Sequence, residues 1–169
     1  MAIFSNDLVL ELPDIKKIEF IKINKNYLKV ILINLFLVFS PLYIGLILLH
    51  QLVFTKEINE FIIPIYSVFT AVFGFVIWYI LLSFTKRKYA LREKDISYKS
   101  GLLIRQITTV PFSRIQHVET DEKPISRIFG LASLSIYTAG DSSDDLVIKG
   151  ITKKKALKIK EFITTKINE

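Results

Sequence analysis

The fold is decided by two stretches, VILINLFLVFSPLYIGLILLHQLVF (Val30–Phe54) and FIIPIYSVFTAVFGFVIWYILLSF (Phe61–Phe84), which only Thr55–Glu60 separates. Neither stretch contains an Asp, Glu, Lys or Arg residue. Each is longer than the ~20 residues that a helix needs to cross a hydrocarbon core of ~30 Å. A soluble helix that is apolar all round would need a very large core to bury it. We therefore predict a transmembrane helical hairpin over residues 25–86.

The bulk composition fits a hairpin joined to one small polar domain. The chain has 169 residues, of which 51% are hydrophobic and 23% are charged, and this length leaves room for little more. The absence of Cys excludes a disulfide framework and a thiolate metal site. The net charge of +7 favours an anionic partner, which for a membrane protein is the acidic lipid surface rather than nucleic acid. We expect no cofactor.

The segment before the first span, residues 1–24, is interpreted as a cytoplasmic segment that lies at the membrane interface. Ile15, Ile18 and Phe20 alternate with basic residues there, as in interfacial segments; a plain tether is the alternative. Charges are spread through the first 29 residues, so we expect no signal peptide and expect the first span to act as the insertion signal. Asn24 is the expected N-cap of the first span.

The distribution of Lys and Arg predicts the orientation of the hairpin. The loop between the spans carries one basic residue, Lys56, beside Glu57 and Glu60. The outer flanks of the two spans carry more: Lys25, Lys29, Lys86, Arg87, Lys88 and Arg92. Because basic flanks stay in the cytoplasm, we predict a multi-pass protein of the bacterial cytoplasmic (inner) membrane with both termini cytoplasmic.

Small and polar residues mark one side of each span. They recur at helical spacing, as Asn34, Val38, Pro41 and Gly45 in the first span and Ser67, Thr70, Ala71 and Gly74 in the second. Small residues let helix backbones approach closely in lipid, so we predict that these two stripes meet. Asn34 and His50 could instead line a substrate path, but two helices cannot enclose one, and a structural role is favoured.

From Lys86 onward the apolar residues recur with a period of two. Strands are expected at residues 87–92, 96–99, 102–110, 113–120, 132–137 and 146–149. Short turns between them, including Ser100-Gly101, predict an antiparallel sheet. Residues 123–129 are expected to form a short helical turn closed by Gly130 as its C-cap. Ala132, Leu134 and Ile136 should face the core.

The final element is predicted to be an amphipathic helix after Thr152 as N-cap. Its apolar residues recur at helical spacing: Ala156, Ile159, Phe162, Ile163 and Ile167. Its charged face includes Lys153, Lys154, Lys155 and Lys158. Together with Lys86, Arg87 and Lys88, these lysines are predicted to contact membrane lipid, since a basic group near an anionic leaflet contributes about 1 kcal/mol. A simple solvated helix face is the alternative.

Three separated motifs follow one another in the polar part of the chain. They are Pro111-Phe112-Ser113-Arg114-Ile115-Gln116, Arg127-Ile128-Phe129-Gly130-Leu131 and Thr138-Ala139-Gly140. Together with strands that precede a C-terminal helix and two spans ahead of them, this order resembles the bacterial pleckstrin-homology (PH) domain of YdbS-like membrane proteins. The resemblance covers about 140 residues. It implies an α+β membrane protein: a transmembrane hairpin, then a PH-like antiparallel β domain over residues 87–169 with a C-terminal amphipathic helix.

The resemblance implies a protein that is not an enzyme. The name PH suggests lipid binding, but the first hairpin of the domain, near Glu93-Lys94-Asp95, has no cluster of Lys and Arg to grip a polyphosphate headgroup. A specific inositide pocket is therefore not expected.

Other candidate sites are weak. The acidic run Asp141–Asp145 favours a hairpin turn over a cation site, because it lacks the Gly and distal Glu of an EF-hand loop. His117 lies in mid-strand and is expected to be packed or at the surface. Arg114 and Arg127 could clamp an anion or contact a partner, although internal bonds to the fold are favoured.

The sequence therefore favours a membrane-anchored interaction or scaffolding module, which binds a protein partner, its own copies or anionic lipid at the cytoplasmic face. Exposed strand edges favour self-association. The alternative is an accessory subunit of a larger envelope or transport complex that acts through its transmembrane helices. No Ser-His-Asp, metal-ligand or phosphate-loop pattern indicates an enzyme.

Overall fold

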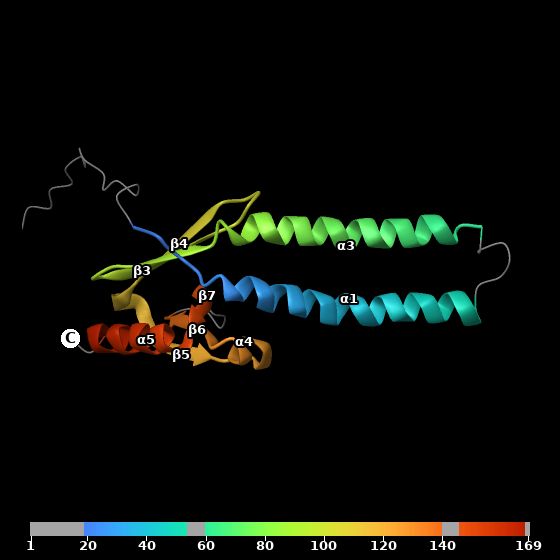
Figure 1. Ribbon diagram of the computed structural model, residues 1–169. Helices are drawn as coiled ribbons and strands as arrows, with labels where there is room; N and C mark the ends of the chain where they lie inside the picture. The colour runs from blue at the N-terminus through green and yellow to red at the C-terminus, as the bar shows by residue number, and fades with distance from the viewer. Residues whose placement is uncertain (1–18, 54–59, 140–145, 168–169) are drawn as a thin grey trace, which may run out of the picture.

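Two long helices project side by side from one end of a β-rich domain (Figure 1). The computed structural model describes residues 19–53, 60–139 and 146–167. The helices are α1 (Asn26–Leu52) and α3 (Ile62–Phe84), and both are long and apolar enough to cross a membrane. They are almost wholly unburied, so their apolar surface is not used to build a protein core. The predicted helical hairpin is confirmed at this level.

The β-rich domain contains two antiparallel sheets. The first has the order β1-β2-β3-β4 and consists of β1 (Ile21–Lys22), β2 (Lys88–Leu91), β3 (Asp95–Ser100) and β4 (Gln106–Pro111). The second has the order β5-β6-β7 and consists of β5 (Ile115–Asp121), β6 (Leu131–Thr138) and β7 (Leu146–Thr152). The one-turn helix η2 (Phe112–Arg114) joins the two sheets, α4 (Pro124–Ile128) joins β5 to β6, and α5 (Lys153–Ile167) follows β7.

The core lies between the two sheets and α5. Ile96 from the first sheet, Leu134 and Ile148 from the second, and Ile163 from α5 are all fully buried in one hydrophobic cluster. The predicted stripe of α5 supplies its part of this cluster through Ala156, Ile159 and Ile163. The inward positions Ala132, Leu134 and Ile136 of β6 are confirmed. The alternating pattern of the sequence thus builds a core in the way expected for sheets with one covered face.

The segment before the first span joins the β domain, which corrects its interpretation as a separate interfacial segment. Ile21 and Lys22 pair with Tyr89 and Lys88, so β1 adds a strand to the edge of β2. Ile23, the next residue, is buried in the core cluster. The edge of β2 offers unpaired backbone groups, and Ile23 gains from leaving water. Residues 1–18 lie outside the described residues.

The tip of the β3–β4 hairpin differs from the expected long strand. Residues 102–105 form a loop, and β4 begins only at Gln106, which pairs with Ser100. Gly101 has a φ of +95°, a region that residues with a Cβ rarely adopt. This glycine turns the chain so early that Leu103 and Ile104 leave the sheet.

Candidate functional site

The first span is fixed to the β domain at Gly150. Gly150 has a φ of +80°, and a Cβ there would lie 2.5 Å from Cγ of Tyr27. The aromatic ring of Tyr27 therefore lies directly on the backbone of β7. The N–H of Asn24 donates to the carbonyl of Gly150 at 2.9 Å, and Oδ1 of Asn24 accepts from the N–H of Asn26 at 2.9 Å. The N-cap position of α1 is Lys25 rather than the expected Asn24, and Asn24, one residue earlier, accepts from the first helical N–H, so the helix begins on the domain itself.

The short helix α4 supports the same end of α1. Val30 in α1 and Ser126 in α4 are both buried, and the two helices are in contact. Gly130 ends α4 with a φ of +63° and donates its N–H to the carbonyl of Arg127, as a C-cap glycine does. Its own carbonyl accepts from the N–H of Lys153 at 3.0 Å. The N-terminal end of α1 is thus held by two elements of the β-rich domain, β7 and α4.

Ion pairs join α4 to the start of α5. Oε1 of Glu122 lies 2.8 Å from Nζ of Lys153, and Oε2 of Glu122 lies 4.0 Å from Nε of Arg127. This is the internal role that was favoured for Arg127. Arg114 stands at the other end of β5, whose seven residues span roughly 20 Å at ~3.3 Å each. The two arginines lie at opposite ends of β5, which does not favour a shared anion, and contact of either arginine with a partner stays a prediction.

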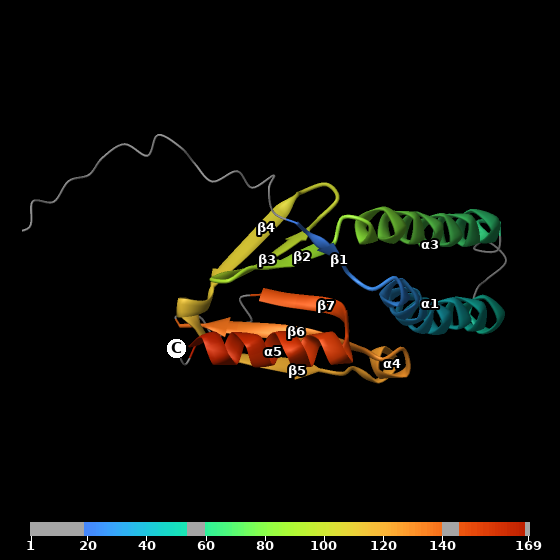
Figure 2. The same cartoon turned by 60° about the vertical axis from the view of Figure 1, so that its left-hand side comes forward.

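The predicted lipid-contacting lysines fall into two groups. Lys86, Arg87 and Lys88 follow α3 directly, and only Lys86 is fully exposed. Lys153, Lys154, Lys155 and Lys158 of α5 are exposed, but α5 runs away from the two long helices (Figures 1 and 2). Lys153, Lys154 and Lys155 lie at the end of α5 nearer the spans, and Lys158 lies one turn further away. Nζ of Lys155 lies 5.9 Å from the ring centre of Tyr89 in its own domain.

Arg87 also affects a neighbouring tyrosine. Burial raises the pKa of the Tyr98 phenol above its ordinary value, and the positive charge of Arg87 partly opposes that rise. Tyr98 lies on β3 and packs against the core cluster. The basic segment after the second span is therefore partly folded into the β domain rather than free to meet a headgroup.

A small polar cluster lies on the outer surface of β5 and β6. The rings of His117 and Tyr137 are stacked with centres 4.2 Å apart, and Nε2 of His117 lies 3.6 Å from Oε1 of Glu119. The hydroxyl of Tyr137 donates to Oε2 of Glu119 at 3.2 Å. His117 and Glu119 are each about half exposed (54% and 52%), so the cluster has no enclosed space for a substrate. The expected surface position of His117 is confirmed.

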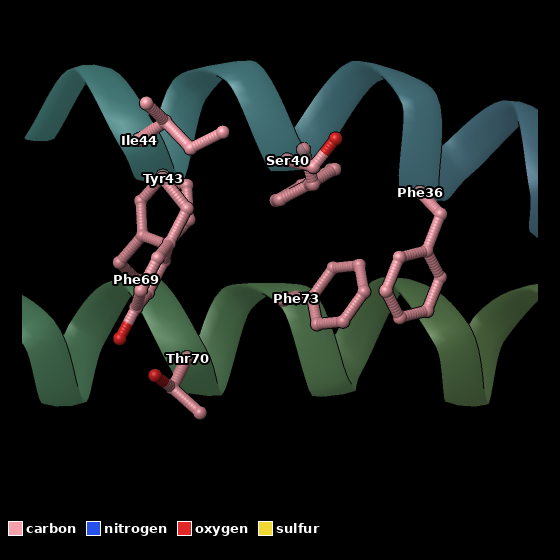
Figure 3. A pocket seen from close by; sticks show the side chains of 8 residues that line it. Phe36, Ser40, Tyr43, Ile44, Phe69, Thr70 and Phe73 are labelled. Atoms are coloured by element: carbon pink, nitrogen blue, oxygen red, sulfur yellow. The ribbon is translucent and has the colours of Figure 1, made fainter.

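The two spans meet through aromatic rings. Phe39 lies 4.8 Å from Phe73 and 5.7 Å from Phe69 between ring centres, and Phe36 meets Phe73 edge-on at 5.5 Å. Tyr43 and Tyr66 extend the seam toward the end of the helices that is far from the β-rich domain, where the Tyr66 hydroxyl lies 3.5 Å from Nδ1 of His50. A cavity of about 390 Å³ opens along this seam, with an apolar lining apart from Ser40, Thr70 and Tyr43 (Figure 3).

The predicted contact between the small-residue stripes differs from the structure. A Cβ added at Gly45 or Gly74 would meet no other residue within 4 Å. The stripe on α3 is exposed at all four positions, and Thr70 is directed away from α1 (Figure 3). Asn34 donates to the carbonyl of Val30 in its own helix at 2.8 Å. Large rings bury more surface than glycines do, and here they keep the two backbones apart; Val38 and Pro41 are exposed as well.

No metal centre is found in the part of the chain that the structure describes, since His, Cys, Asp and Glu form no group of three there. The acidic run Asp141–Asp145 lies outside the described residues. Sequence reasoning missed the Tyr27–Gly150 junction. An isolated Gly inside a strand pattern often marks a close approach of another group, and that signal at Gly150 could have found it.

Comparison with known proteins supports this architecture. The family model described as "Bacterial PH domain" matches residues 27–167, which include both spans, both sheets from β2 onward and α5. The chain belongs to the bacterial PH domain family. The matched part of the chain contains the two long helices together with the PH-like domain.

A curated relative points the same way. The chain is 35% identical over 52 residues to the "UPF0699 transmembrane protein YdbS" of Bacillus subtilis (strain 168). The aligned part is 31% of this chain and 33% of that protein, so the chain matches about a third of the relative's length. No solved structure matches the chain.

Proposed function

We propose that this protein is a membrane-anchored, non-enzymatic PH-like module that acts as an interaction or scaffolding element at the cytoplasmic face of the bacterial inner membrane. Two observations support the anchoring: α1 and α3 are unburied, apolar and long enough to span, and a relative carries the name of a transmembrane protein. The observation that carries the proposal is the junction of Tyr27 with Gly150, because it holds the PH-like domain against the end of the first span.

The module binds either anionic lipid or a protein partner, including its own copies. The exposed lysines at the start of α5 and Lys86 after α3 supply positive charge on the side of the domain where the spans emerge. Basic residues on both flanks of the hairpin favour cytoplasmic termini.

The orientation is tested by chemical labelling. Because the chain has no Cys, single variants such as Glu60→Cys between the spans and Thr164→Cys on α5 give unambiguous signals. In intact spheroplasts a membrane-impermeant maleimide should label Glu60→Cys and not Thr164→Cys, and inside-out vesicles should give the reverse. Val72→Cys in mid-span is the control and should react only after detergent is added. Labelling of Thr164→Cys from outside would overturn the proposed topology.

An accessory subunit of a larger envelope or transport complex is a second candidate. It is favoured by one observation, which is that the small residues Ala71 and Gly74 remain exposed and are not used within the hairpin. Small residues allow close packing of a further helix. Disulfide crosslinking of an Ala71→Cys variant in native membranes separates the possibilities. A product with twice the mass of the chain indicates association with its own copies. A product of any other mass above that of the chain indicates a disulfide with a different membrane protein.

A further inference from the structure

Three large apolar side chains outside the two long helices are far more exposed than any other large apolar side chain of the described β-rich domain. Leu103 is 84% exposed, Ile104 is 83% exposed and Ile128 is 80% exposed. The other exposed apolar residues of that domain, for example Leu157 at 47%, are about half exposed or less. A single exposed Leu or Ile is ordinary, but three such residues at one end of a domain form a pattern.

All three residues lie at the end of the domain from which the spans emerge. Leu103 and Ile104 form the tip of the β3–β4 hairpin, which reaches toward the inner end of α3 (Figures 1 and 2). Ile128 is the last residue of α4, which packs on the inner end of α1. The tip of the β3–β4 hairpin and α4 therefore lie on opposite sides of the pair of long helices, at the level where these helices leave the β-rich domain.

The tip of the β3–β4 hairpin is a turn defined by a glycine with positive φ and by the last strand pair before it. Gly101 has a φ of +95°, and a Cβ there would collide with the carbonyl oxygen of Ile104. The pairing of Ser100 with Gln106 closes the loop on its other side. Leu103 and Ile104 therefore lie at this turn, outside the paired part of the sheet, where their side chains are exposed.

Basic residues accompany both apolar tips. Arg105 beside Ile104, and Lys123 and Arg127 on the α4 side, are exposed. On the α4 side, Glu122 lies between Arg127 and Lys153, 4.0 Å and 2.8 Å from them. Within the part of the chain that the structure describes, Lys123 is therefore the basic residue there that forms no ion pair. No acidic residue occurs between Asp95 and Glu119. Apolar side chains with basic neighbours are the combination that enters the boundary between lipid headgroups and acyl chains.

We propose that Leu103 and Ile104 on one side of the spans, and Ile128 on the other, insert into the interfacial layer of an anionic lipid bilayer. The inference rests on the proposed membrane anchoring and adds a function to it. Two insertion points on opposite sides of the pair of long helices restrain tilting of the β-rich domain. The module then presents one fixed face to the cytoplasm.

The test places an environment-sensitive fluorophore on single cysteines in the full-length protein, reconstituted in vesicles that contain phosphatidylglycerol. The reporting variants are Leu103→Cys and Ile128→Cys, whose side chains are exposed and whose substitution removes no core contact. Thr164→Cys on α5 is the exposed reference, and Val72→Cys is the mid-span reference. Quenching is compared between a lipid that carries a nitroxide near its headgroup and iodide in the water.

Insertion predicts that the labels at 103 and 128 emit at shorter wavelength than the label at 164, are quenched by the nitroxide lipid and are shielded from iodide. If both behave like the label at 164 while the label at 72 is quenched by lipid, the inference is overturned and the anchoring stands. If the label at 72 is not quenched by lipid, the anchoring itself fails. Shielding that depends on protein density, without quenching by lipid, would assign these residues to a protein contact and overturn the inference.

Discussion

At the scale of single residues, Gly150 is the glycine at which both the backbone conformation and the neighbouring ring of Tyr27 oppose a substitution. Its positive φ disfavours any side chain, and the ring of Tyr27 occupies the space where a Cβ would be. The residue therefore couples the conformation of β7 to the placement of the first span.

We predict that Gly150→Ala lowers the free energy of unfolding of the β domain by about 1–3 kcal/mol through backbone strain, with a further loss from the collision. Gly130→Ala is the matched control, since Gly130 has a φ of +63° but open space around its Cβ position. Chemical denaturation in detergent micelles measures both. Equal losses for the two variants would show that contact with Tyr27 contributes nothing.

Tyr98 gives a prediction about pH. Its pKa is raised in the folded protein, mainly by burial, so the unfolded chain loses the phenolic proton first, at its ordinary pKa of about 10. The stabilisation is complete below that pH and is lost as the pH rises through the folded pKa. We expect Tyr98→Phe to flatten the fall of unfolding free energy at alkaline pH. An unchanged slope between wild type and variant would contradict this cause.

At the scale of elements, the sequence predicts the order of strands and helices and fails where the pattern is too short or too uniform. β1 is only two residues long, in a segment of mixed character, so no periodicity reveals it. The spans are apolar on every side, so hydrophobic spacing cannot tell which face of α1 meets α3. Residues 102–105 continue an apolar run, and only the positive φ of Gly101 removes them from the strand.

The contribution of the segment that contains β1 can be measured with two isoleucines, Ile21 within β1 and Ile23 just after it. Ile23 is 5% exposed and Ile21 is 42% exposed. We predict that Ile23→Ala costs about 2–5 kcal/mol of unfolding free energy, as core truncations do, and that Ile21→Ala costs under about 1 kcal/mol. Equilibrium unfolding in micelles, followed by near-ultraviolet circular dichroism, compares them. Similar small losses for both would mean that this segment is dispensable.

At the scale of the whole molecule, the candidate site is a junction between two bodies rather than a pocket with catalytic groups. The basic residues that the sequence places near lipid are only partly available, because Arg87 lies close to Tyr98 and Lys153 pairs with Glu122. Such pairing depends on which residues the fold brings together, and linear spacing does not reveal it.

The association of the two spans should depend on the aromatic seam. We predict a coupling of about 0.5–1.5 kcal/mol between Phe39→Ala and Phe73→Ala in a double-mutant cycle, which is typical of aromatic pairs. Phe75 is the control, because its ring packs against Trp78 of its own helix, and it should show no coupling to Phe39. Unfolding of the hairpin in bicelles provides the measurement. Coupling of equal size for Phe75 would refute a specific seam.

The pairing of β1 with β2 has a consequence for biogenesis. β1 is translated before the first span, and β2 is translated after the second. If α1 and α3 both span the bilayer, as we propose, the two strands lie in the same compartment only after the chain has crossed the bilayer twice. A chain that integrates with a single pass leaves its carboxyl-terminal half without the amino-terminal strand and with a bare edge at β2. In the proposed topology, the pairing of β1 with β2 is therefore available only to a chain whose two long helices have both inserted.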